Sequence, residues 1–170
     1  MASLMEEFTA VLQEEEKKYR ELITLSYEKK DVIIQANVDR LDEITEEEQK
    51  ITTVLHNLEL KRDSVLSDMA IVLNKKKEDL TVEKMISLME KLPKEQEKLI
   101  HLRTSLRSTL DEMKKINSQN QMLIQQAIEM TEFDLTLFKS LKQAPETANY
   151  NKNAYSTGEL LGRSGFDAKQ

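Results

Sequence analysis

The chain has 170 residues and carries 25 Lys and Arg against 31 Asp and Glu, so its formal net charge is −6. This acidic balance argues against a nucleic-acid partner, which clustered cations would have to neutralise, and against docking on an anionic membrane face. The chain has no Cys, which excludes disulfides, thiolate nucleophiles and Cys-type zinc sites.

No segment has the pattern of a membrane span or of a signal peptide. The longest unbroken apolar run extends only from Met69 to Leu73, whereas a membrane span needs about 20 residues. The first ten residues, MASLMEEFTA, lack a basic segment followed by an apolar one. We therefore expect a cytoplasmic protein without membrane insertion.

The distribution of glycine predicts the fold class. All three glycines lie at or after Gly158, and the chain has two prolines. The preceding stretch is rich in Glu, Lys, Leu, Gln and Met, which favours long helices, and it has no glycine-rich phosphate loop. Because no segment alternates polar and apolar residues for long, the sequence predicts an all-α fold. The expected architecture is a long antiparallel helical bundle with coiled-coil character.

Apolar residues at steps of three and four predict the first two helices, over 3–36 and 38–73. Asn37 lies between them as a predicted cap. The second helix keeps a heptad register in which two positions are polar, Glu48 and Arg62. We interpret each of these side chains as reaching solvent or a partner on a neighbouring helix, which would fix the register of the bundle.

A short helix over 81–91 and a long one over 93–141 follow, with Pro93 suited to a first helical turn. Two rows of residues spaced by seven run along the long helix, from Leu99 to Leu141 and from Leu102 to Leu137. So long a helix must bury its stripe, so we predict one bundle over 1–141. The composition then changes, and we predict a flexible tail over 142–170 that contributes to partner binding.

Asn120 occupies one of these heptad rows. Our interpretation is a buried amide that bonds across the bundle and sets its register. The alternative is a direct contact between Asn120 and a bound partner.

The sequence shows no constellation that would carry catalysis or hold a metal. The two histidines, His56 and His101, lie in different predicted helices, and neither belongs to the Glu-x-x-His motif of a di-metal bundle. The acidic residues over 42–48 fall on more than one helical face and form no caged ligand set. We expect no catalytic, cofactor or metal site, and hence no enzyme.

The positive signal is an excess of large apolar residues late in the last helix, several of them outside the heptad rows. Such an excess indicates either deeper burial, under the short helix or the tail, or a surface for a partner. The tail also keeps large apolar residues that a simple linker would not need. The predicted partner-binding residues are Met122, Ile124, Ile128, Phe133, Leu137, Phe138, Leu141, Tyr150, Tyr155, Leu160 and Leu161.

Two segments resemble a known family. The run Val38-Asp-Arg-Leu41-Asp-Glu-Ile44-Thr-Glu-Glu-Glu48 resembles the second helix of FlgN-type flagellar export chaperones. The segment that holds Asn117 and Asn120 is similar to the Asn-x-x-Asn segment of that family's last helix. The order, spacing and length of the helices agree over about 1–141, and the tail agrees only loosely.

The resemblance implies a cytoplasmic helical chaperone that needs no cofactor. It would bind C-terminal helical segments of hook-associated (hook–filament junction) proteins and deliver them to the flagellar type III secretion apparatus. Its guest would bind through the C-terminal part of the last helix and the region after it. The alternative is a non-catalytic coiled-coil scaffold or spacer that uses the apolar excess to pair with itself as a homo-oligomer. A third alternative, an enzyme or metalloprotein, would need a bound metal or cofactor.

Overall fold

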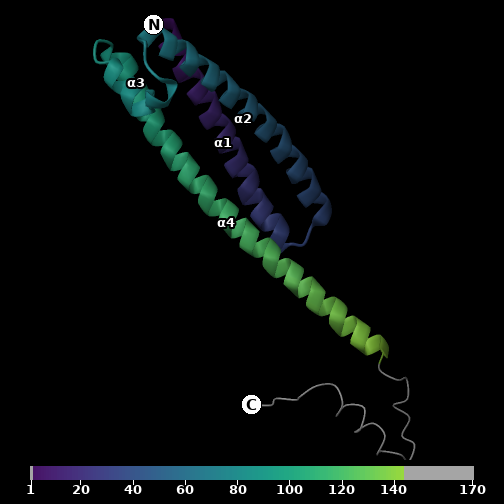
Figure 1. The fold of residues 1–170 in the computed structure, drawn as a ribbon. Coiled ribbons are helices and arrows are strands. Elements are labelled where there is room, and N and C mark those ends of the chain that lie inside the picture. Colours follow the sequence, from purple (N-terminus) through teal and green to yellow (C-terminus); the bar gives the residue numbers. More distant parts are fainter. Residues whose placement is uncertain (1, 144–170) are drawn as a thin grey trace, which may run out of the picture. The chain divides into compact units, whose positions relative to one another are not determined.

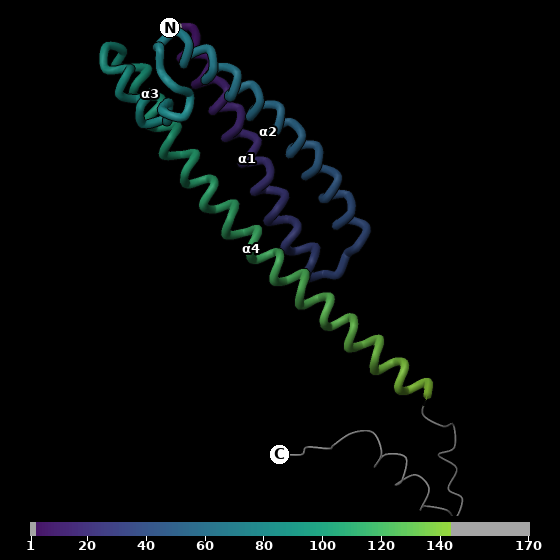
Figure 2. Tube along the Cα trace, viewed as in Figure 1, coloured from purple at the N-terminus to yellow at the C-terminus, as the bar shows by residue number. Residues whose placement is uncertain are grey.

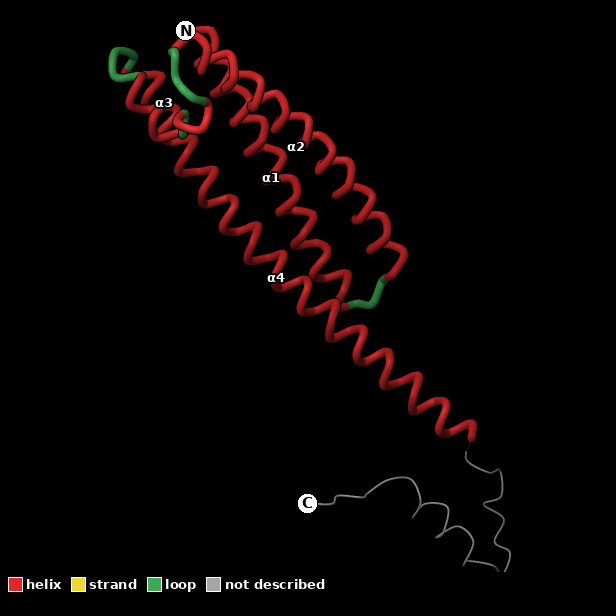
Figure 3. The backbone as a smooth tube through the Cα atoms, viewed as in Figure 1, coloured by secondary structure: helices red, strands yellow, loops and turns green. Residues whose placement is uncertain are grey.

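The computed structural model describes residues 2–143, and every regular element among them is a helix (Figures 1 and 3). In chain order these elements are α1 (Ala2–Ile34), α2 (Val38–Leu73), the short 3₁₀ helix η1 (Lys77–Asp79), α3 (Val82–Leu88) and α4 (Pro93–Gln143). This confirms the all-α prediction. The chain divides into two compact units, Met1–Glu129 and Met130–Gln170. The tail predicted over 142–170 lies almost entirely outside the described residues, so its flexibility and the boundary at 141 stay predictions.

The helix bounds differ from the predicted ones at two turns. The first helix ends at Ile34 because Ala36 takes a left-handed conformation, with φ of 53°. Asn37 then begins α2 as its N-cap, its side chain accepting a hydrogen bond from the backbone N–H of Arg40, as predicted. The short helix α3 ends at Leu88 rather than 91, and α4 begins at Pro93.

In the first unit, α1 lies between α2 and α4 (Figures 1 and 2). A short turn joins α1 to α2, so these two helices run antiparallel. Both polar heptad residues of α2 pair with residues of α1. This confirms the prediction that they reach a partner on a neighbouring helix. Arg62 pairs with Glu15 at 2.9 Å, and Glu48 pairs with Lys29 at 2.8 Å. These pairs fix the register of α2 on α1.

An apolar core cluster lies where α3 packs against the other three helices. Phe8 of α1, Met69 of α2, Met85 of α3 and Leu99 of α4 are all at most 1% exposed. The seven residues of α3 are too few to form a stable helix alone. The burial of Met85 therefore holds α3 in place, and α3 closes this end of the bundle.

The heptad rows of α4 are not buried over their whole length. In the first unit they are buried as far as Ile116 and Asn120, whereas Leu137 and Leu141 are exposed. Helix lengths explain this difference from the predicted bundle. The 33 residues of α1 span about 50 Å, and the 51 residues of α4 span about 77 Å. Neither α1 nor α2 is long enough to cover all of α4.

Candidate functional site

The described part of the second unit carries an exposed apolar stripe. All its described residues, up to Gln143, are solvent-exposed. The large apolar ones are between 49% and 69% exposed. These residues are Met130, Phe133, Leu135, Leu137, Phe138 and Leu141.

Four of these side chains share one helical face. Met130, Phe133, Leu137 and Leu141 follow one another at steps of three and four, which places them within about one quarter of the helical circumference. We call these four residues the apolar stripe. Phe138 lies beside it, and the ammonium group of Lys142 is 4.7 Å from the centre of its ring. A stripe of this kind is suited to one face of a partner helix.

The structure separates the predicted site residues into three groups. Phe133, Leu137, Phe138 and Leu141 lie together on the second unit. In the first unit, Met122 and Ile128 are exposed, but Ile124 is half-buried and lines a polar pocket. The predicted residues of the tail lie outside the described residues; they are Tyr150, Tyr155, Leu160 and Leu161.

Sequence reasoning missed two members of the exposed set. Met130 belongs to a predicted heptad row, and neither Met130 nor Leu135 is among the predicted partner-binding residues. Comparing the lengths of the predicted helices would have shown that the last one exceeds the first two. That difference in length is the signal for an uncovered segment.

The large apolar residues of α3 are used within the first unit. Met85 and Met89, the large inward residues around the end of α3, are buried in the core of the first unit with Leu99. The stripe itself is exposed to solvent among the described residues.

A second candidate site lies wholly in the first unit, as a pocket of about 450 Å³ among α1, α2 and α4. Asn120 of α4 is 4% exposed, and its Nδ2 donates a hydrogen bond of 2.7 Å to the backbone carbonyl of Ser26. This confirms the predicted bond across the bundle. The Oδ1 of Asn120 is also buried, and it has no hydrogen-bond partner among the described residues. Asn117 is exposed, with its Oδ1 3.5 Å from the hydroxyl of Ser26.

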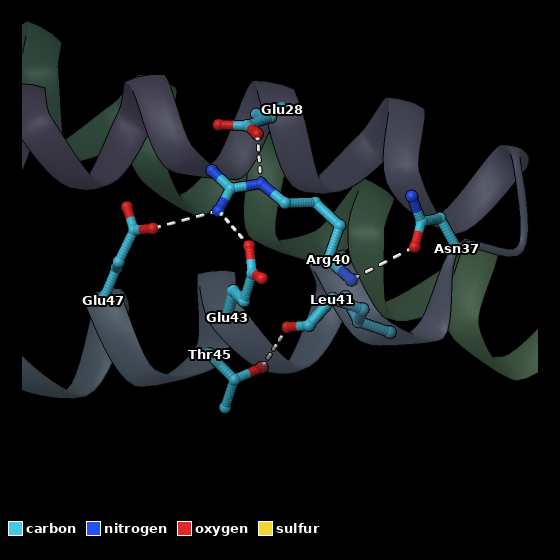
Figure 4. Close-up of polar contacts among 7 residues, drawn as sticks. All are labelled: Glu28, Asn37, Arg40, Leu41, Glu43, Thr45 and Glu47. Atoms are coloured by element: carbon cyan, nitrogen blue, oxygen red, sulfur yellow. Dashed lines mark hydrogen bonds and ion pairs between the residues drawn. The ribbon is translucent and has the colours of Figure 1, made fainter.

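Arg40, just before the acidic segment over 42–48, pairs with two of its carboxylates. Arg40 donates from Nε to Glu28 at 2.7 Å and from Nη1 to Glu43 at 2.8 Å and Glu47 at 3.1 Å (Figure 4). The hydrogen bond from Arg40 lowers the pKa of Glu28, and the three carboxylates together raise the pKa of Arg40. The pair of Arg40 with Glu28 joins the start of α2 to α1, whereas its pairs with Glu43 and Glu47 lie within α2.

Two further observations concern residues 2–143 only. No three His, Asp or Glu side chains gather there in a way that could hold a metal ion. None of the helices in this range combines the length and the apolar character that a membrane crossing requires.

Comparison with known proteins gives one match. A family model described as the FlgN protein matches residues 1–157. No curated protein and no solved structure matches the chain. The matched range includes all four α-helices and most of the chain. The chain therefore belongs to the FlgN family, a family of non-enzymatic flagellar export chaperones.

Proposed function

We propose that this protein is a cytoplasmic chaperone for hook-associated proteins, which binds their C-terminal helical segments and delivers them to the flagellar type III secretion apparatus. The observation that carries the proposal is the exposed apolar stripe, Met130, Phe133, Leu137 and Leu141, with Phe138 beside it. Residues of this size are costly to leave in contact with water unless they serve a partner. Family membership supports the general chaperone role.

The chemistry of the stripe suits a guest that must be released again. A filament-type C-terminal segment exposes apolar heptad residues that would otherwise associate with one another. The stripe offers them one helical face, whose length from Met130 to Leu141 is about 17 Å. A contact this small gives modest affinity, because only a few side chains are desolvated.

The first experiment is calorimetry of the full chain against C-terminal segments of the hook-associated proteins from the same organism. We expect binding, and we expect the double variant Phe133→Ala/Phe138→Ala to weaken it about 30-fold, since truncation of an anchor residue commonly costs about 2 kcal/mol. Both side chains are exposed, at 67% and 56%, so the variant should keep its fold. Circular dichroism checks this.

A matched control removes two exposed apolar side chains elsewhere. Leu60 and Ile71 of α2 are 57% and 78% exposed, so Leu60→Ala/Ile71→Ala loses a comparable apolar surface outside the stripe. Unchanged guest affinity in this control, with weakened affinity in the phenylalanine variant, supports the proposal. Equal affinity in the wild type and the phenylalanine variant would remove these two anchors from it.

A chain that ends at Leu141 tests the predicted contribution of Tyr150, Tyr155, Leu160 and Leu161. We expect weaker guest binding by this shortened chain, and unchanged binding would place the whole site before residue 142. Sedimentation at several concentrations tests the scaffold alternative. A stable homo-oligomer that binds no guest segment would favour the scaffold over the chaperone.

A further inference from the structure

The apolar stripe is a small surface, which restricts what can cover it in the free chain. It runs about 17 Å from Met130 to Leu141, and its four side chains are exposed. Two copies of the chain that paired through faces this short would barely reach the roughly 1,000 Å² that a stable interface between separate proteins needs. An occupant tethered beside the stripe is therefore favoured over a second copy, because a tether makes even a weak contact effective.

The chain itself supplies such an occupant. Residues 144–170 directly follow α4 and are assigned to the same unit as the stripe. Within them, residues 159–166 have the sequence Glu-Leu-Leu-Gly-Arg-Ser-Gly-Phe, which contains three large apolar residues, Leu160, Leu161 and Phe166. We call residues 159–166 the covering segment. Its apolar content is what a segment that packs on the stripe requires.

The connection between α4 and the covering segment is long enough for the chain to return. It consists of residues 144–158, and Pro145 follows shortly after the last residue of α4, as is common after a helix end. A flexible chain of this length has a root-mean-square span of about 20 Å, and the effective concentration of its far end at the stripe is about 1 mM or more. A contact with a Kd of about 1 mM is negligible between separate chains at micromolar concentrations. Within one chain, the same contact would be occupied for much of the time.

The order of charges selects the direction of the return. On α4, Asp134, Phe138 and Lys142 follow one another at steps of four along one edge of the stripe, so a negative charge precedes a positive one by about 12 Å. The covering segment has the same order, with Glu159 before Arg163, about 13 Å apart in an extended chain. Its glycines disfavour a helix. An antiparallel return therefore places each carboxylate opposite a cation at matching spacing, whereas a parallel one places like charges together.

We propose that residues 159–166 fold back antiparallel to α4 and cover the apolar stripe in the free chain. The leucines of the segment lie over the C-terminal end of the stripe, and its phenylalanine lies over the N-terminal end. Glu159 pairs with Lys142, and Arg163 pairs with Asp134. A contact of this strength opens and closes, so a partner of the stripe binds by displacing the segment. The proposal depends on the exposed stripe and on the sequence of residues 159–166, and it holds whatever that partner is.

The first test compares the full chain with a chain that ends at Thr157, by amide hydrogen exchange without any guest. The shorter chain lacks the covering segment but keeps α4 and almost all of the connection. Exchange over 130–143 should become about 3- to 10-fold faster, and exchange over 99–120 in the first unit should not change. The full-length variant Leu160→Ser/Leu161→Ser should give an increase of the same direction, because it removes apolar contacts of the segment and leaves its charges.

A charge reversal tests the direction of the segment. The variant Glu159→Arg/Arg163→Glu keeps the net charge and reverses the order of the two charges. Exchange over 130–143 should become about 2- to 3-fold faster, a modest effect because exposed ion pairs contribute little. The matched control is Glu146→Arg/Lys152→Glu, which reverses two charges of the connection in the same way and should leave exchange unchanged.

Adding Asp134→Arg/Lys142→Glu to the reversed segment makes the charges complementary again and should restore the slower exchange. Failure of this rescue overturns the antiparallel arrangement. Unchanged exchange in the chain that ends at Thr157 overturns the proposal as a whole, and so does protection over 130–143 that disappears on dilution, which would assign the cover to a second copy. No guest is present in these measurements, so their outcome is independent of the proposed function, which calorimetry tests. In that calorimetry, the chain that ends at Thr157 separates the cover, whose loss favours guest binding, from the tyrosines of the tail.

Discussion

Glu15 shows how a buried charge is held between two helices. Its side chain is 5% exposed and accepts a hydrogen bond of 2.9 Å from Nη1 of Arg62. Burial raises the pKa of Glu15, and the nearby Glu59 raises it further, whereas Arg62 opposes both. The net shift is upward, so the folded chain binds a proton at this position more readily than the unfolded chain does.

This shift predicts a pH dependence for the variant Glu15→Gln. A carboxyl whose folded pKa is raised stabilises the fold most when it is protonated, below its unfolded value of 4.5. That contribution is lost as the pH rises through the folded pKa. We therefore expect the free energy of unfolding of the wild type, relative to Glu15→Gln, to increase as the pH falls from 7 to 5. Urea unfolding at each pH measures it.

Glu16, the neighbouring carboxylate, supplies a control of opposite sign. Burial would raise its pKa, but hydrogen bonds from the hydroxyl of Ser105 and from Arg20 outweigh burial, and the net shift is downward. The contribution of Glu16 is present above the unfolded value and is lost as the pH falls through the folded pKa. Relative to Glu16→Gln, the wild type should therefore lose stability in acid. If wild-type stability changed with pH in the same direction relative to both variants, the raised pKa of Glu15 would be contradicted.

The sequence predicted which polar residues need a hydrogen-bond or ion-pair partner, but it did not predict which residue that partner is. Arg62 and Asn120 were recognised because each places a polar group at an apolar position of a heptad. Their partners, Glu15 and the carbonyl of Ser26, depend on the axial offset between helices. Periodicity fixes the face of a helix, but the offset is set by packing over the whole contact, which local sequence does not show.

The turns between helices depend on backbone conformations that apolar periodicity does not show. Ala36 and Asn74 both have positive φ, at 53° and 49°. At each turn two backbone hydrogen bonds close the end of the helix. At the first turn the N–H groups of Ala36 and Asn37 donate to the carbonyls of Ile33 and Val32. At the second, those of Asn74 and Lys75 donate to the carbonyls of Ile71 and Ala70. Asn is common in this conformation, whereas Ala is not, so the sequence predicts Ala36 to be helical.

Ala36→Gly is predicted to stabilise the protein. The left-handed conformation costs a residue with a Cβ about 1–2 kcal/mol, and the greater freedom of Gly in the unfolded chain offsets about half of this. We expect an increase of about 0.5–1 kcal/mol in the free energy of unfolding, measured in urea. Asn74→Gly is the comparison and should change less, because Asn tolerates this conformation. A loss of stability in Ala36→Gly would show that the methyl group of Ala36 makes a contact that outweighs its strain.

For the whole molecule, burial predicts how local stability varies along α4. Between Leu99 and Asn120, side chains at regular intervals are buried in the first unit. From Gln125 to Gln143 every described residue is exposed, so the helix there gains stability mainly from its own backbone bonds and side-chain pairs. Local opening is least costly where few apolar contacts resist it.

Hydrogen exchange of the free chain should therefore be faster over 130–143 than over 99–120, by about tenfold or more. A bound guest segment should slow exchange over 130–143 if it covers the apolar stripe. Residues 52–60 of α2 belong to the first unit and serve as the internal reference. Equally slow exchange in both parts of the free α4 would mean that the stripe is already covered in solution. A dilution series would then separate the two causes: protection that disappears on dilution comes from a second copy, and protection that persists comes from the chain itself.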